Sequence, residues 1–259
     1  MGILNLTPDS FFDGGSLISE KEVVQKAKKM LDDGATFLDV GGYSSRPGAD
    51  FVSEEEELNR VIPVIQLLIK EFPEAIISID TFRSNVAEKA VLAGAAIVND
   101  ISGGNLDEQM FETIASLKVP YIAMHMRGTP KTMASLTKYE DITKELIYYF
   151  SEKINKATSH GIKDIIIDPG FGFAKTQEQN FELMNHLELF NHLEAPLLVG
   201  ISRKSMIYKT LANSPKEALN GTTVLHSIAL FKGAHILRVH DVKEAKECIT
   251  LIQNLKGKP

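Results

Sequence analysis

Short apolar runs alternate with longer amphipathic stretches along the whole chain. Eight of these runs are apolar or β-branched throughout, as strands buried on both faces should be. They are Gly2–Asn5, Phe37–Gly41, Ile76–Asp80, Ile97–Asp100, Tyr121–His125, Ile165–Asp168, Leu197–Ile201 and Ile236–His240. The stretches between them carry helix signals; Val23, Ala27 and Met30, for example, recur at the spacing of one helix face. The pattern therefore predicts eight strand–helix units.

Several residues indicate where the helices begin and end. Ser53 and Glu56 have the spacing of a capping box, in which each side chain bonds the other residue's backbone N–H. Asp241 and Glu244 suggest a similar start for the last helix. Gly94 follows a helical stretch where a left-handed residue is wanted, so we expect it to end that helix.

Eight strand–helix units in 259 residues are typical of a closed (β/α)8 barrel. An open doubly wound sheet would use fewer strands and carry a glycine-rich phosphate loop after the first one. The segment that begins at Asn5 reads Asn-Leu-Thr-Pro-Asp and is no such loop. We therefore predict an α/β protein with one TIM-barrel domain over residues 1–259.

The composition narrows the possible partners. Hydrophobic residues make up 44% of the chain and charged residues 24%, which is ordinary for a globular protein. The single cysteine, Cys248, excludes an internal disulfide and favours a reducing compartment. No apolar run approaches the ~20 residues that cross a bilayer, and the net charge of −6 without a basic stripe disfavours nucleic acid. We expect a cytoplasmic protein that binds neither membrane nor nucleic acid.

Polar residues gather where the expected strands end, and barrel enzymes build their active sites at that rim. These residues are Asn5, Asp80, Asn99, Asp100, His125, Asp168, Ser202, Arg203, Lys204, Arg238 and His240. Any one of them could simply cap a helix or bond a loop amide. Their concentration on one rim favours a site for a polar ligand.

The first group of these side chains suits a flat heterocycle. Asp80, Asp168 and Asn99 together accept and donate hydrogen bonds, as a ring with amidine-type N–H groups requires. Each of these residues could instead bind a loop amide, so the prediction of a heterocycle site depends on all three together.

The second group suits an anion. Arg238, His240 and Lys204 supply donors, and Arg238 and His240 follow the eighth strand, close to the usual phosphate position of barrels. Asn5 adds a hard oxygen, and Mg²⁺ often takes few protein ligands and completes its shell from phosphates and water. A buried structural asparagine is an equal alternative for Asn5.

Two long connections follow the first two strands. Residues 7–15 include the adjacent pair Phe11 and Phe12, and residues 43–48 include Pro47 and Gly48. A plain surface loop rarely carries two adjacent phenylalanines, so we expect lids that close over a substrate. A loop folded onto its own small cluster is the alternative.

Several segments together resemble the dihydropteroate synthase family. They are Met1–Phe11 (MGILNLTPDSF), Asp39–Gly48 (DVGGYSSRPG), Ser78–Arg83 (SIDTFR), Asp168–Lys175 (DPGFGFAK), Gly200–Ser205 (GISRKS) and Arg238–His240 (RVH). They occur in order and span nearly the whole chain. The resemblance implies a Mg²⁺-assisted reaction in which 6-hydroxymethyl-7,8-dihydropterin pyrophosphate loses pyrophosphate and its methylene carbon joins the amine of p-aminobenzoate. It also implies inhibition by sulfonamides and a homodimer.

The resemblance carries roles over to particular residues. For the pterin these are Asp80, Asn99, Met124, Asp168, Phe173 and Lys204. For metal and pyrophosphate they are Asn5, Arg238 and His240, with Asn5 as the metal ligand. For p-aminobenzoate they are Phe11, Asp13, Ser45, Arg46, Pro47 and Ser202, with Gly200 as a further substrate contact. Lys204, Arg238 and Asp80 are the expected catalytic residues.

The sequence departs from the family pattern in two places. Ser45 stands where the family has threonine, and the chain begins at its first expected strand, whereas relatives usually carry a short hairpin before it. Either the sequence is truncated or another segment covers that end. Two alternatives share the pterin-holding residues: a methyltransferase barrel and a non-enzymatic pterin-binding module. The methyltransferase would not need the loop containing Phe11, the Ser-Arg-Pro-Gly loop or the Ser-Arg-Lys motif that begins at Ser202. The binding module would have no reason to retain Asn5, Arg238 and His240 for pyrophosphate.

Overall fold

The computed structural model describes residues 1–6, 20–43 and 51–257 of the chain. Within these ranges strands and helices follow one another from the first strand to the last helix. The strands are β1 (Gly2–Asn5), β2 (Phe37–Gly41), β3 (Ile76–Asp80), β4 (Ile97–Asp100), β5 (Tyr121–Met124), β6 (Ile165–Asp168), β7 (Leu198–Val199) and β8 (Ile236–Leu237). The predicted strands are confirmed; β5, β7 and β8 are shorter than expected, and beside β7 and β8 the residues Leu197 and Val239 form single parallel bridges.

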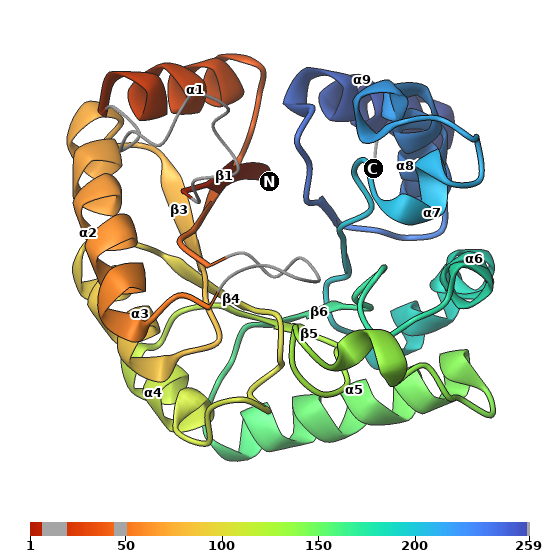
Figure 1. The fold of residues 1–259 in the computed structure, drawn as a ribbon, viewed down its shortest axis with the longest axis horizontal. Coiled ribbons are helices and arrows are strands. Elements are labelled where there is room, and N and C mark those ends of the chain that lie inside the picture. Colours follow the sequence, from red (N-terminus) through yellow and green to blue (C-terminus); the bar gives the residue numbers. More distant parts are fainter. Residues whose placement is uncertain (7–19, 44–50, 258–259) are drawn as a thin grey trace.

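The helices lie on the outside of the ring of strands (Figure 1). They are α1 (Glu20–Asp32), α2 (Glu54–Glu71), α3 (Ser84–Leu92), α4 (Met110–Leu117), α5 (Ile142–Ser159), α6 (Gln177–Asn185), α7 (Ser205–Tyr208), α8 (Leu219–Phe231) and α9 (Val242–Lys256). Short 3-10 helices occur at Met133–Ser135, Leu187–Leu193 and Pro215–Glu217. Two helices, α7 and α8, separate β7 from β8, whereas the described residues place a single α-helix between each of the other successive strands.

The strands pair in parallel in the order of the chain. β1 to β6 form one sheet and β7 with β8 another. Parallel bridges between Gly2 and Val239 and between Ile167 and Leu197 span both junctions of these sheets. The pairing thus runs once around the ring, and the fold is the predicted (β/α)8 barrel.

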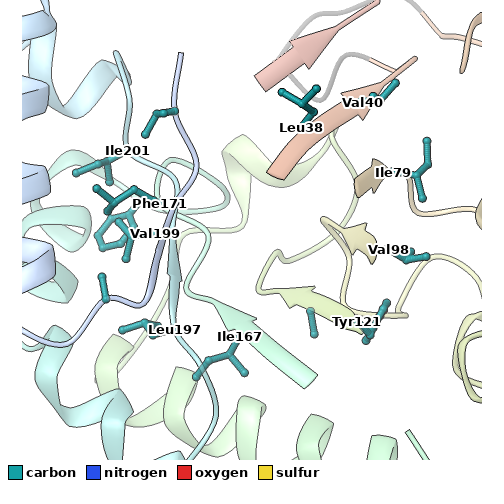
Figure 2. Close-up of a cluster of buried hydrophobic side chains, with 14 of the residues drawn as sticks. Leu38, Val40, Ile79, Val98, Tyr121, Ile167, Phe171, Leu197, Val199 and Ile201 are labelled. Atoms are coloured by element: carbon teal, nitrogen blue, oxygen red, sulfur yellow. The ribbon is translucent and has the colours of Figure 1, made fainter. Parts of the chain in front are cut away.

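The outward side of each strand packs against the helices. On β2, Leu38 and Val40 are completely buried in the main core together with Val61 and Ile65 of α2. Figure 2 shows part of this layer, including Leu38, Val40, Ile79, Val98, Tyr121, Ile167, Leu197 and Val199. Because side chains alternate along a strand, the residues between these point into the barrel.

The inward side changes character along the barrel axis. Near the start of the strands, Ile97, Ile122 and Leu198 form a separate apolar cluster inside the ring. Two residues further along β4, β5 and β7 the same inward face carries Asn99, Met124 and Gly200. An apolar floor therefore closes the lower barrel, and the polar side chains stand above it.

The helix ends match the sequence only in part. Ser53 Oγ accepts the N–H of Glu56, so α2 has the predicted cap, but the Glu56 side chain binds Arg60 instead of completing the box. Gly94 has φ +119°, as its role after α3 requires. The last helix, α9, begins where Asp241 and Glu244 predicted, with Asp241 as its N-cap residue, but the Asp241 carboxylate makes no capping bond and binds Arg203 instead.

Candidate functional site

Polar side chains from separate strands meet inside the barrel mouth, and Arg238 is their centre. Its Nε donates to Asp39 Oδ2 at 2.6 Å, and its Nη2 donates to Asp80 Oδ2 at 2.6 Å. Asn99 Nδ2 donates to the same oxygen of Asp39 at 3.0 Å. The Arg238 guanidinium thereby links β2 to β3, and Asn99 of β4 joins them through Asp39. We call Asp39, Asp80, Asn99, Asp168 and Arg238 the polar cluster.

Asp39 is the member of the polar cluster that the sequence analysis did not single out. Its side chain is fully buried, and no described residue is hydrogen-bonded to its Oδ1. Ser78, its register partner on β3, likewise has no hydrogen-bond partner for Oγ among the described residues. A carboxylate in the middle of an apolar strand is costly unless it is paired, and this was the signal available in the run Phe37–Gly41.

Burial shapes the acid–base properties of the polar cluster. It raises the pKa of Asp80 to about 7, although the Arg238 guanidinium works in the opposite direction. Burial also raises the pKa of Asp168. For Arg238, burial alone would lower the pKa, but Asp39 and Asp80 outweigh it and the pKa is raised. The guanidinium is thus a fixed cation beside carboxyl groups that gain protons easily.

Two glycines leave room between the members of the polar cluster. A Cβ on Gly200 would lie 3.8 Å from both Arg238 Cβ and Asp168 Oδ2. A Cβ on Gly41 would lie 3.6 Å from Asp80 Oδ2 and 3.7 Å from Asn5 Oδ1. The absent side chains therefore leave space beside Asp168 and Arg238, and the oxygens of Asn5 and Asp80 flank one glycine.

Lys204 and Phe173 lie at the edge of the polar cluster. Lys204 Nζ donates to the carbonyl oxygen of Phe171 and lies 4.7 Å from the centre of the Phe173 ring. Burial lowers the pKa of Lys204 to about 8, against the opposing charge of Asp168. Met124 belongs to a small apolar cluster against which Phe173 packs. Lys204 thus lies between the apolar side chains of Met124 and Phe173 and the carboxylate of Asp168.

Ser202 and His240 form a pair between the ends of β7 and β8. Ser202 Oγ accepts the backbone N–H of His240 at 3.2 Å and lies 3.1 Å from its Nδ1. Arg203, the next residue, has φ +56° and binds Asp241 through Nε and Nη2 at 2.8 and 2.9 Å. The two strand ends are therefore cross-linked twice.

Asp100 and His125 make their contacts away from the polar cluster. Asp100 points to the helix side of β4, where Tyr121 donates to it at 2.7 Å, because its neighbour Asn99 takes the inward position. His125 packs against Tyr149 and is hydrogen-bonded to Lys175. The expectation of a single polar rim is thus wrong for Asp100.

The expected p-aminobenzoate residues of the two loops cannot be placed beside these groups. Phe11, Asp13, Ser45, Arg46 and Pro47 lie outside the described residues. Their assignment stays a prediction from the sequence.

The described part of the chain holds no group of three or more histidine, cysteine, aspartate or glutamate side chains arranged as a metal site. None of the described helices is both long and apolar enough to cross a bilayer.

A cleft of about 1050 Å³ lies by the β5–α5 connection, with Arg127, Tyr139 and Tyr149 among its walls. It reaches His125 but contains no member of the polar cluster. The polar cluster is the better candidate because its donors and acceptors converge from several strands.

Known proteins resemble the chain over almost its full length. The family described as pterin binding enzyme matches residues 1–240. The dihydropteroate synthase of Escherichia coli K12 is 46% identical over 98% of this chain and 90% of its own, and that of Synechocystis is 48% identical over 94% and 85%. The Yersinia pestis dihydropteroate synthase, solved with a sulfonamide drug complex, superposes with a TM-score of 0.93 at 40% identity, covering 98% of this chain and 93% of its own. The Xanthomonas albilineans dihydropteroate synthase with 4-aminobenzoic acid gives 0.92 at 38%, covering 100% and 93%.

Proposed function

The chain belongs to the pterin-binding enzyme family and acts as a dihydropteroate synthase, and we propose that the polar cluster with Lys204 is where it binds the pterin. It condenses 6-hydroxymethyl-7,8-dihydropterin pyrophosphate with p-aminobenzoate to give 7,8-dihydropteroate and pyrophosphate. Relatives with this activity match nearly the full chain, which removes the methyltransferase and the non-enzymatic module as alternatives.

The convergence of Asp80, Asn99 and Asp168 inside one barrel mouth carries the pterin assignment. The pterin ring offers amino and ring N–H donors, and these carboxyl and carboxamide groups offer acceptors above an apolar floor. Lys204 contributes a half-buried donor, and Met124 and Phe173 give the flat ring apolar neighbours. Arg238 fixes the orientation of Asp80 before the substrate arrives.

Arg238 and His240 are proposed to bind the pyrophosphate. A permanently charged guanidinium beside the reacting carbon stabilises the charge that grows on the leaving group. His240 follows the same strand, and its backbone N–H is already oriented by Ser202. Loss of pyrophosphate leaves a cationic methylene carbon on the pterin, and the neutral arylamine attacks it. The surplus proton of the new C–N product passes to the released pyrophosphate or to water, so no general base from the protein is required. Lys204, Arg238 and Asp80 are the proposed catalytic residues, because each touches the pterin or its leaving group in this arrangement.

We also propose that the chain uses Mg²⁺ with Asn5 as its protein ligand. The Asn5 carboxamide oxygen stands beside the same glycine as Asp80, and hard oxygens are the donors that Mg²⁺ prefers. When bound, the ion supplies positive charge that neutralises pyrophosphate oxygens. Ser202 and Gly200 are proposed to contact p-aminobenzoate, together with Phe11, Asp13, Ser45, Arg46 and Pro47 of the two loops. Relatives solved with sulfonamides make these drugs the expected competitors for that site.

Three broader assignments are proposals as well: residues 1–259 act as one domain, the enzyme works in the cytoplasm, and two copies form a homodimer. The unpaired Cys248 is compatible with a reducing compartment. The dimer is supported by an exposed apolar face on two adjacent helices. Its residues are Val224, Ile228 and Phe231 of α8 and Leu251 and Leu255 of α9.

The pterin assignment is tested with Asp80→Asn in a pyrophosphate-release assay with Mg²⁺ and both substrates. We expect the KM for the pterin substrate to rise about 10-fold or more, because one charged acceptor is lost, and the KM for p-aminobenzoate to change little. Asp164→Asn is the matched control, since Asp164 is exposed at the opposite end of β6. Equal changes in both KM values would remove Asp80 from the pterin site.

A further inference from the structure

The connection from β6 to α6 has an unusual backbone. Gly170, Gly172 and Ala174 have φ values of +69°, +81° and +49°, so three of five consecutive residues are left-handed. Glycine tolerates this conformation, but Ala174 is strained in it. A chain in this shape persists only where its surroundings hold it.

Lys175 holds this connection from within. Its side chain is 8% exposed, and Nζ donates to the carbonyl oxygens of Gly170 at 3.0 Å and Phe173 at 2.9 Å. A third hydrogen bond of 3.0 Å joins Nζ to His125 Nδ1. The carbonyl oxygen of His125 lies 3.5 Å away, so four acceptors surround one Nζ, two of them in the connection itself.

His125 forms the other side of this arrangement. Burial lowers the pKa of His125 to about 2, with the charges of Lys175 and Arg127 adding to the effect, so the imidazole is neutral and Nδ1 can accept a hydrogen bond. The ring packs edge-on against Tyr149, with 4.8 Å between centres. A Cβ on Gly170 would lie 2.1 Å from the carbonyl oxygen of His125, so the connection lies directly on the end of β5.

The connection places two groups on Lys204. The carbonyl oxygen of Phe171 accepts the Lys204 Nζ hydrogen bond, and the Phe173 ring lies 4.7 Å from the same nitrogen. The backbone N–H of Gly170 also donates to Asp168 Oδ1 at 2.8 Å. A change in the shape of the connection would therefore move the surroundings of both Lys204 and Asp168.

We propose that Lys175 is a positioning residue of the synthase reaction: by holding the β6–α6 connection, it sets Lys204 and Phe173 against the pterin. This inference rests on the proposed pterin site. Burial lowers the pKa of Lys175 well below that of a free lysine, so an apolar side chain would be less costly to bury here. The two carbonyl bonds explain why a lysine occupies the position.

The test compares Lys175→Met, Lys175→Arg and Tyr139→Phe. The methionine variant keeps the length of the side chain and removes all the hydrogen bonds of Nζ, whereas arginine restores donors. Tyr139→Phe is the matched control, because Tyr139 donates to Ala174 of the same connection at 3.0 Å without touching the carbonyls that Lys175 binds. Far-UV circular dichroism and urea unfolding report the fold, and steady-state kinetics with Mg²⁺ report the KM of each substrate and kcat.

For Lys175→Met we expect a folded protein whose KM for the pterin substrate rises about 10- to 100-fold, while the KM for p-aminobenzoate at saturating pterin changes little. Arginine should recover part of this loss, and Tyr139→Phe should be near wild type. Wild-type kinetics in a folded methionine variant, equal changes in both KM values, or unfolding of both lysine variants would each overturn the positioning role. An inactive wild type would instead contradict the proposed function.

Discussion

The polar cluster behaves as one electrostatic unit at the scale of single residues. Arg238 bonds both Asp39 and Asp80, so neither carboxylate can be changed without altering the surroundings of the other. Burial raises the pKa of Asp80 to about 7. Protonation of this carboxyl group can therefore be followed by measuring stability near neutral pH.

Asp80→Asn should therefore change how stability depends on pH. The folded-state pKa of Asp80 lies above its ordinary value, so the carboxyl contributes most to stability below about pH 4, and this contribution is lost as the pH rises to about 7. Relative to Asp80→Asn, the wild type should lose about 2–3 kcal/mol of unfolding free energy between pH 5 and pH 7, at about 1.4 kcal/mol per pKa unit. Urea unfolding of both proteins at several pH values measures the difference. A constant difference would mean that Asp80 ionises like a surface aspartate.

The sequence predicted most members of the polar cluster for one physical reason. Asp80 and Asp168 end their strands and Asn99 lies one residue before the end of β4, and parallel strands bring their ends to the same rim. Asp39 lies two residues before the end of β2, so a rule based on strand ends passes over it. Asp100 ends β4 but faces the helices, because one residue along a strand reverses the face.

At the scale of elements, local sequence patterns predicted where strands and helices lie. They did not predict which side chains bind one another. The apolar runs gave the strands because each must be buried on both faces. The capping interpretation of Asp241 failed because its partner, Arg203, lies 38 residues earlier and no local pattern reveals it. The same limit applies to Lys175, whose contact with His125 spans 50 residues.

Asp241→Ser separates the two interpretations of Asp241. Serine is a good N-cap, so a capping role would be preserved, whereas the paired bonds to Arg203 would be lost. We expect a loss of about 2 kcal/mol in the free energy of unfolding, measured by urea denaturation, because hydrogen bonds between charged groups are broken. Arg203→Met in the Asp241→Ser background should cost only the further hydrogen bonds that Arg203 donates to the carbonyl oxygens of Pro215 and Lys216, since the pair is already broken. Unchanged stability in Asp241→Ser would restore the capping interpretation.

For the whole molecule, the fold followed from counting strand–helix units, since eight buried strands with helices between them close into a ring. The sequence does not reveal which outer helix face stays exposed. The structure shows Val224, Ile228 and Phe231 at 38–60% exposure, spaced along one side of α8. Large apolar side chains exposed on one helix side are typical of an interaction surface.

Ile228→Glu combined with Phe231→Glu should therefore convert the proposed dimer to a monomer. Two carboxylates buried without partners across a twofold interface would oppose association strongly, because each copy brings the same pair. Sedimentation velocity should show half the wild-type mass, and the Tm should no longer depend on protein concentration. Leu92→Glu is the control, since Leu92 is 71% exposed on α3, away from α8 and α9, and it should leave the mass unchanged. If the wild type sediments as a monomer, or the double variant keeps the dimer mass, the contact lies elsewhere or does not form.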